Sequence, residues 1–140
     1  VLIDTSKEDW LESVLESTDG KGADVLIDML SGDFVNKNME ATKINGHLIN
    51  IGRLAGMKGV FNYDLHAKRR LHYVGTTGRT RSVQENLEVA RVANKDLWDH
   101  VVDGKIRHVI FKTFSLDNAN SALNLMNENK HFGKLILLPD

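Results

Sequence analysis

Three glycines follow one of the apolar runs of this 140-residue chain, and they are its first candidates for chemistry. They form the pattern Gly52-x-x-x-Gly56-x-x-Gly59. Glycine lets a backbone approach a phosphate or a ring closely, because it has no Cβ. The dinucleotide-binding fingerprint, however, is G-x-G-x-x-G after a first strand and at the start of a helix, and no part of the chain fits it. The pattern alone favours glycines in an ordinary turn.

The loop Gly75-Thr76-Thr77-Gly78-Arg79-Thr80-Arg81 is the second candidate, and it lies between an apolar run and a long helical pattern. Its hydroxyls, free amides and two arginines are groups that can hold an anion at the N-terminus of a helix. The alternative is a capped turn whose arginines are solvated. The residues alone leave both interpretations open.

Acid–base and metal chemistry have weaker candidates. Asp28 ends an apolar run where a carboxylate can act as an acid or a base, although such aspartates more often cap the next turn. The chain has no cysteine, and its six histidines show neither H-x-x-x-H nor H-E-x-x-H spacing. We therefore predict no catalytic residue and no metal ligand within these residues. The histidines are His47, His66, His72, His100, His108 and His131.

The elements that position these residues centre on Ala23–Gly52, which predicts a strand, a helix and a second strand. The apolar runs Val25–Ile27 and His47–Ile51 flank a helical stretch from about Asp33 to Lys43. Continuous apolar runs are typical of parallel strands that are buried on both faces. Ligands of such sheets bind at the carboxyl ends of the strands. We therefore expect a ligand at Asp28–Gly32 and Gly52–Gly56.

The remaining pattern continues the alternation of strands and helices. Val1–Ile3 is predicted as a short strand, and Thr5 or Ser6 as the cap of the next helix. Ser82 is a candidate N-cap for a helix over Val83–Val102, which Gly104 ends. The other expected elements are a helical turn around Leu65, strands over Leu71–Gly75, Val109–Phe114 and Gly133–Leu138, and a helix over Leu116–Asn127. The order predicts an α/β fold with a mostly parallel sheet.

Composition excludes several classes of protein. Eighteen basic and 19 acidic residues give a net charge of −1, so there is no general attraction to nucleic acid or to an anionic membrane. No apolar run approaches the roughly 20 residues that span a bilayer, and we expect a cytoplasmic protein. The chain begins on an apolar run without an initiating methionine, so we expect a piece of a longer protein.

Taken in order, several segments resemble the C-terminal portion of the medium-chain dehydrogenase/reductase superfamily, and most closely its zeta-crystallin-like quinone oxidoreductase branch. The segments GTTGRTRS and NKHFGKLIL are the most specific, and VLIDTSKEDW, GKGADVLIDMLSG, GHLINIG and VDGKIRHVIFKTFSL also match. The chain departs from the family at DMLSGD, where the family has D-x-V-G-G. The resemblance implies the second half of a Rossmann-type, doubly wound sheet over residues 1–104. Residues 105–140 would be a closing segment that returns to a catalytic domain.

The resemblance also implies which residues face a bound cofactor, NADPH or alternatively NADH. Thr5 would lie near the adenine, and Met29 and Leu30 under the adenosine. The nicotinamide half would meet Ile51, Gly52 and Arg53 and the backbone of Val74, Gly75 and Thr76, and Asn129 would reach the cofactor from the closing segment. The glycine loop that holds the pyrophosphate in the family is not in this chain, so we expect the chain alone to be inactive.

By the same resemblance, the intact protein is expected to pass hydride from NADPH to a quinone or an enone without zinc. Strand 71–75 would pair with its twin in a homodimer. Two alternatives stay open within the superfamily, an enoyl reductase and a zinc alcohol dehydrogenase. A third alternative is a non-catalytic α/β module that dimerises through its edge strand.

Overall fold

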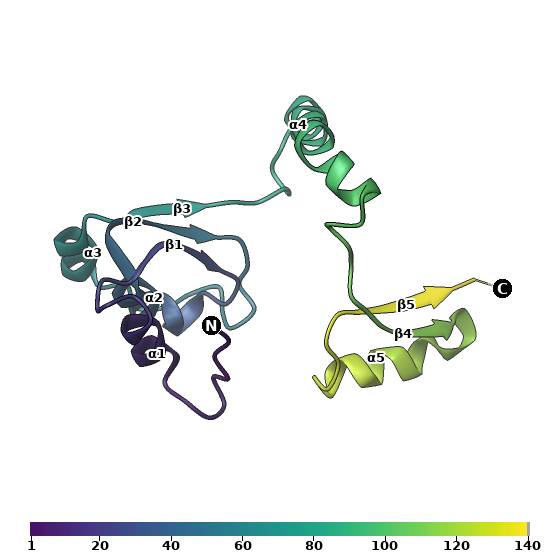
Figure 1. The fold of residues 1–140 in the computed structure, drawn as a ribbon, viewed down its shortest axis with the longest axis horizontal. Helices are drawn as coiled ribbons and strands as arrows, with labels where there is room; N and C mark the ends of the chain where they lie inside the picture. Colours follow the sequence, from purple (N-terminus) through teal and green to yellow (C-terminus); the bar gives the residue numbers. More distant parts are fainter. Residues whose placement is uncertain (140) are drawn as a thin grey trace. The chain divides into compact units, whose positions relative to one another are not determined.

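The computed structural model describes residues 1–139 and divides into two compact units (Figure 1). The first unit is Val1–Arg81, and the second begins at Ser82. Each unit has its own parallel sheet, and each is described separately below. The predicted α/β class with parallel strands is confirmed, because every strand pair in the described residues is parallel.

The first unit is built on a three-stranded sheet of β1 (Ala23–Asp28), β2 (Thr42–Asn50) and β3 (His72–Gly75), in the order β1-β2-β3. Asp28 lies opposite Asn50, and Asn50 lies opposite Gly75. The three strands therefore end level with one another, and the loops that follow them meet at one edge of the sheet.

Helix α2 (Val35–Ala41) lies at the centre of the packing in this unit. It follows the short 3₁₀ helix η1 (Gly32–Phe34) and contacts α1 (Trp10–Glu16), α3 (Tyr63–Arg69), β1 and β2. The buried core consists of Val35, Met39, Leu48 and Leu71, with Leu26, Phe61 and Leu65 packed against it. Val35 and Met39 come from the helical stretch that the sequence predicts, and Leu65 packs in α3 as expected.

Within the first unit, only one face of β1 is covered. Leu26 points into the core, whereas Val25 and Ile27 are 55% and 65% exposed. Successive side chains of a strand point to opposite faces, and within residues 1–81 no helix covers the face with Val25 and Ile27. The expectation of burial on both faces therefore stays a prediction for the chain as a whole.

The expected strand at Val1–Ile3 is wrong, because residues 1–9 form no strand and Val1 and Leu2 are almost fully exposed. A strand needs a neighbour for its hydrogen bonds, and none of the described strands pairs with this segment. The cap of α1 is also not Thr5 or Ser6. Asp9 is the N-cap, and its side chain accepts a hydrogen bond from the backbone N–H of Leu11 at 2.9 Å.

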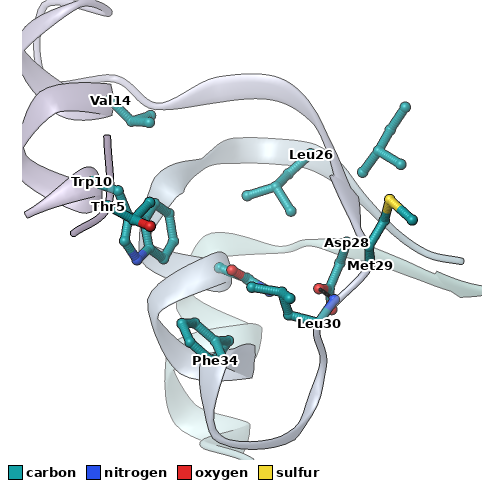
Figure 2. Close-up of a pocket in the computed structure, with 10 residues that line it drawn as sticks. Thr5, Trp10, Val14, Leu26, Asp28, Met29, Leu30 and Phe34 are labelled. Carbon is teal, nitrogen blue, oxygen red and sulfur yellow. Dashed lines mark hydrogen bonds between the residues drawn. The ribbon is translucent and has the colours of Figure 1, made fainter. Parts of the chain in front are cut away.

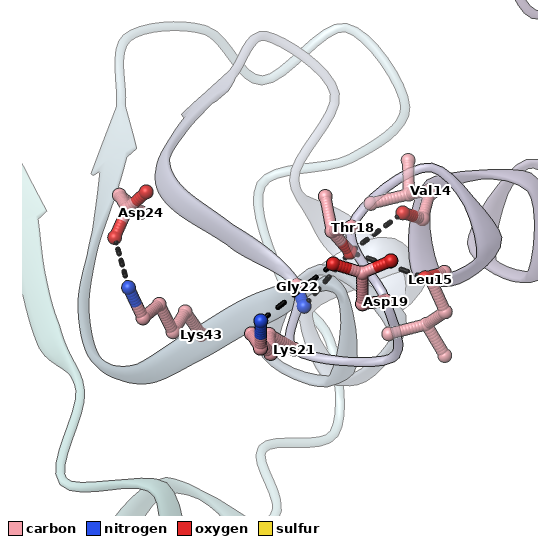
Figure 3. A network of polar contacts seen from close by, with 8 residues as sticks. All are labelled: Val14, Leu15, Thr18, Asp19, Lys21, Gly22, Asp24 and Lys43. Atoms are coloured by element: carbon pink, nitrogen blue, oxygen red, sulfur yellow. Dashed lines mark hydrogen bonds and ion pairs between the residues drawn. The ribbon is translucent and has the colours of Figure 1, made fainter.

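The turn between α1 and β1 is closed by Thr18 (Figure 3). Its hydroxyl donates to the carbonyl of Val14 at 2.8 Å and accepts from the backbone N–H of Gly22 at 3.0 Å. Across the next strands, Lys43 on β2 pairs with Asp24 on β1 at 2.7 Å. The pair is exposed, so it contributes little to stability.

The second unit contains α4 (Val83–Val102), β4 (Ile110–Ser115), η2 (Leu116–Asn118), α5 (Ala119–Asn127) and β5 (Lys134–Leu138). β4 and β5 form a parallel pair, and α5 contacts both strands, with Ala122 buried. Helix α4 has the predicted bounds. The structure describes all of its side chains, and none of them is buried. The division at Arg81 groups α4 with the closing segment, and the predicted domain boundary at 104/105 stays a prediction.

Candidate functional site

A buried polar network joins the carboxyl ends of β1 and β2. Asp28, Ser31 and Asn50 are 3%, 8% and 6% exposed. The Asp28 carboxylate accepts from the backbone N–H groups of Leu30 and Ser31, at 2.8 and 3.0 Å. Asp28 therefore caps the turn after β1, which is the alternative that the sequence favoured over acid–base catalysis.

Ser31 connects this turn to the loop after β2. Its hydroxyl donates to the carbonyl of Gly52 at 2.8 Å and accepts from the side-chain amide of Asn50. The backbone of Ser31 has φ 58° and ψ −147°, a region that glycine almost alone adopts. The first glycine of the family pattern D-x-V-G-G falls at this position. Ser31 therefore gains hydrogen bonds through its hydroxyl but holds a backbone conformation that is unfavourable for serine.

Two of the three glycines after β2 make close approaches to the chain's own backbone. A Cβ on Gly52 would lie 2.6 Å from the carbonyl oxygen of Met29, and one on Gly59 would clash with the backbone of Gly32. These glycines pack the two strand-end loops together, and Ser31 and Gly56 form a parallel bridge between the same loops. The interpretation as glycines in a turn is thus supported for Gly52 and Gly59.

An apolar cavity of about 410 Å³ opens beside the end of β1 (Figure 2). Three predicted cofactor residues, Thr5, Met29 and Leu30, line it. Trp10 from α1 and Phe34 from η1 supply aromatic walls. A planar, mostly apolar group such as an adenine ring fits such a wall.

A second and more polar cavity, of about 720 Å³, opens at the ends of β2 and β3, and we call it the arginine cavity. Four predicted cofactor residues line it, namely Ile51, Gly52, Arg53 and Thr76. Its other lining residues are Leu54, Met57, Thr77, Gly78, Arg79 and Arg81. The two loops are adjacent because the backbone N–H of Thr76 donates to the carbonyl of Asn50 at 2.9 Å. Arg53 and the two arginines after β3 therefore share one cavity.

Tyr73 on β3 lies close to both strand-end loops. It lines a small cavity of about 180 Å³ together with Ser31, Asn50 and Arg53. Partial burial raises the pKa of the Tyr73 hydroxyl, and the negative charge of Asp28 raises it further, while Arg53 opposes the shift. The sequence analysis did not single out Tyr73.

The remaining predicted cofactor residues line neither cavity. Val74 and Gly75 are on β3, where Val74 is 42% exposed and nothing lies within 4 Å of a Cβ built on Gly75. Asn129 belongs to the second unit and has φ 52°. The roles of all ten residues stay predictions. Trp10 and Phe34 carried no separate signal in the sequence, because an aromatic residue on a helical stripe usually packs in the core.

Open α/β sheets bind their ligands at the carboxyl ends of the strands, and both cavities of this three-stranded parallel sheet open there. The family model described as zinc-binding dehydrogenase matches residues 1–137, and the chain belongs to this family. It corresponds to the C-terminal part of a medium-chain dehydrogenase/reductase, as the sequence resemblance predicted.

Relatives and solved structures agree with this assignment. A 2-haloacrylate reductase from Burkholderia sp is 27% identical, over 98% of this chain and 41% of that protein. An NAD-dependent alcohol dehydrogenase from Sulfolobus acidocaldarius is 31% identical, over 95% of this chain and 36% of that protein. The quinone oxidoreductase structure from Pseudomonas syringae pv. Tomato DC3000 has the same fold, with a TM-score of 0.78 and 24% identity over 98% of this chain and 42% of that one. The chain spans less than half the length of the curated relatives that it matches.

The residues of this chain do not fit the zinc ion in the family's name. The chain has no cysteine. Among residues 1–139, no group of three or more histidine or acidic side chains is placed to hold a metal ion. His47 and His72 do lie together, with ring centroids 4.5 Å apart, but they form only a stacked pair across β2 and β3. No helix of these residues is both long and apolar enough to cross a membrane.

Proposed function

We propose that this chain is the cofactor-facing and closing part of a zinc-independent, NADPH-dependent quinone oxidoreductase. The observation that carries the proposal is the position of both cavities. They open at the carboxyl ends of three adjacent parallel strands, where sheets of this kind bind their ligands. The relatives that are oxidoreductases support the reaction class.

The residues of this chain would bind and orient the reactants. The apolar cavity would hold the adenosine part against Met29 and Leu30, with Thr5 at its rim. Arg53 and Thr76 would flank the nicotinamide part, and Asn129 would reach it from the closing segment. A bound nicotinamide supplies the hydride for a quinone or an enone, and the protein positions the two. No side chain of this chain is required as an acid or a base.

The Sulfolobus relative is an NAD-dependent alcohol dehydrogenase. It supports the alternative that the intact protein is an alcohol dehydrogenase that uses NADH. An enoyl reductase is the other alternative within the superfamily. Steady-state assays of the intact protein with NADPH and NADH, each with a quinone, an enone, an enoyl thioester and an aldehyde, distinguish these activities. We expect the highest kcat/KM with NADPH and a quinone or an enone. A zinc-dependent aldehyde activity would contradict the proposal.

We also propose that the chain alone neither binds cofactor tightly nor catalyses the reaction. The test is a fluorescence titration of NADPH, and separately of NADH, into the 140-residue chain. We expect no saturation at micromolar cofactor concentrations, because the chain has no G-x-G-x-x-G loop for the pyrophosphate. Micromolar binding would contradict this and would indicate an independent nucleotide-binding module.

The free edge of β3 supports a further part of the proposal, a homodimer. β3 pairs with β2 on one side, and its other edge has no strand beside it in the described residues. An exposed edge strand is a template for pairing with another chain. A second copy of the same strand would cover it around a two-fold axis. A cytoplasmic location likewise stays a prediction.

A further inference from the structure

The arginine cavity holds three positive charges, and the hydride-transfer proposal gives a role only to Arg53. Arg53 follows β2, and Arg79 and Arg81 follow β3. Within residues 1–139, none of the three guanidinium groups lies within ion-pair distance of a carboxylate. Eight other cationic side chains do, namely Lys7, Lys21, Lys37, Lys43, Lys68, Arg91, Lys105 and Lys130.

The walls of the cavity contain no counter-charge either. Its described lining residues include no aspartate and no glutamate. Three like charges in one cavity repel one another, and an anion bound between them would offset that repulsion. The chain as a whole has a net charge of −1, so the excess of positive charge is a property of this cavity and not of the whole chain.

The neutral groups of the cavity complete an anion site. The Thr77 hydroxyl accepts from the backbone N–H of Arg79 at 3.2 Å, so its own proton is available to a ligand. Arginine binds carboxylates and phosphates through paired N–H donors. Ile51, Leu54 and Met57 form an apolar wall beside these polar groups. The lining therefore fits a ligand with an apolar body and one oxyanion group.

We infer that Arg53, Arg79 and Arg81 bind an oxyanion, a carboxylate or a phosphate, of the ligand that occupies the arginine cavity. The oxyanion belongs either to the substrate, such as an α,β-unsaturated acid, or to a phosphate of the cofactor. The inference deepens the proposed oxidoreductase function and rests on it for the choice between these two sources. Binding of the anion itself does not depend on that function.

The first experiment measures anion binding to the 140-residue chain without any reaction. But-2-enoate, nicotinamide mononucleotide and inorganic phosphate are titrated at constant ionic strength, and the amide signals of Thr77 and Gly78 are followed by NMR. We expect saturable shifts that weaken at least tenfold in Arg79→Gln and in Arg81→Gln. Arg107→Gln is the matched control, because Arg107 has no ion pair among the described residues and does not line the cavity. Its affinity should stay within twofold of wild type.

Two results of this titration would overturn the inference. One is the absence of any saturable shift with all three anions. The other is an equal loss of affinity in Arg107→Gln and Arg79→Gln, which would indicate general screening of charge. Amide spectra of the variants show whether the loop after β3 keeps its conformation, so a folding defect is recognised separately.

The second experiment identifies the source of the oxyanion in the intact enzyme. The kcat/KM values of Arg79→Gln are compared for but-2-enoate and for the neutral but-3-en-2-one. A substrate carboxylate predicts a loss of at least tenfold with but-2-enoate and less than twofold with the neutral enone. A cofactor phosphate predicts the same rise in the KM for NADPH with both substrates. If Arg79→Gln keeps the wild-type kcat/KM with both substrates and the wild-type KM for NADPH, the inference is overturned. If the wild-type enzyme reduces neither substrate, the proposed function is refuted, and the NMR titration still decides whether the cavity binds anions.

Discussion

At Ser31 the backbone conformation lowers the stability of the fold, whereas the hydrogen bonds of the side chain raise it. Its backbone lies in a region that costs about 1–3 kcal/mol for a residue other than glycine. Its hydroxyl bridges Asp28, Asn50 and the carbonyl of Gly52. Ser31→Ala removes the bridge and keeps the backbone strain, so we expect a loss of about 1–3 kcal/mol in the free energy of unfolding.

Ser31→Gly separates the two effects. Glycine removes the same hydroxyl but adopts this backbone conformation freely, so we expect it to be less destabilising than Ser31→Ala. Urea denaturation of both variants, followed by Trp10 and Trp98 fluorescence, measures the difference. Equal unfolding free energies would show that the conformation of Ser31 stores no strain.

Tyr73 makes the stability depend on alkaline pH. Its pKa is raised in the folded state, first by burial and then by Asp28. The folded state therefore binds this proton more tightly than the unfolded state does. The resulting stabilisation is complete below the ordinary pKa of tyrosine, about 10, and is lost as the pH rises through the raised value.

Tyr73→Phe has no proton to lose, so its stability should fall less steeply above pH ~10. Urea denaturation of wild type, Tyr73→Phe and the exposed-site control Tyr63→Phe from neutral to alkaline pH tests this. The prediction fails if the difference between wild type and Tyr73→Phe is the same at every pH.

At the level of elements, α4 carries a strong local start signal. Ser82 and Glu85 form a capping box at its N-terminus. Ser82→Ala should cost about 0.5–2 kcal/mol of helix stability, because a backbone N–H loses its partner. Circular dichroism at 222 nm during thermal unfolding measures the loss. Ser121→Ala, at an exposed position within α5, is the control and should change little.

The same local signals explain how well the elements were predicted. Ser82 and Gly104 bracket α4 in the sequence, and the structure gives α4 the predicted bounds. The strand at Val1–Ile3 was predicted wrongly because an apolar run does not reveal whether a neighbouring strand exists. Thr5, Ser6 and Asp9 are all capping residue types, so composition did not determine which one begins α1.

The candidate site was predictable only in parts. The two loops after β2 and β3 were recognised separately from their glycines, threonines and arginines. That Arg53 shares a cavity with Arg79 and Arg81 depends on the register of β2 against β3. Register is a contact between distant parts of the chain, and one sequence does not specify it.

At the level of the whole molecule, the proposed homodimer gives a test at Gly75. The backbone N–H of Thr76 faces β2, so by alternation along the strand the N–H of Gly75 faces the free edge. Gly75→Pro removes that donor, and we expect light scattering to show a monomer where wild type is a dimer. Gly75→Ala keeps the N–H and has room for its Cβ, so it should remain dimeric. A monomeric wild type, or a dimeric Gly75→Pro, would contradict pairing through this edge.

The division of the chain at Arg81 has a consequence for proteolysis. Trypsin cleaves after arginine, and the exposed stretch from residue 77 to 82 contains both Arg79 and Arg81. A brief digestion should therefore cut the protein first between its two compact units. The same two bonds would be the ones shielded when an anion holds their side chains, so the rate of this first cut becomes a simple gel-based reporter of occupancy.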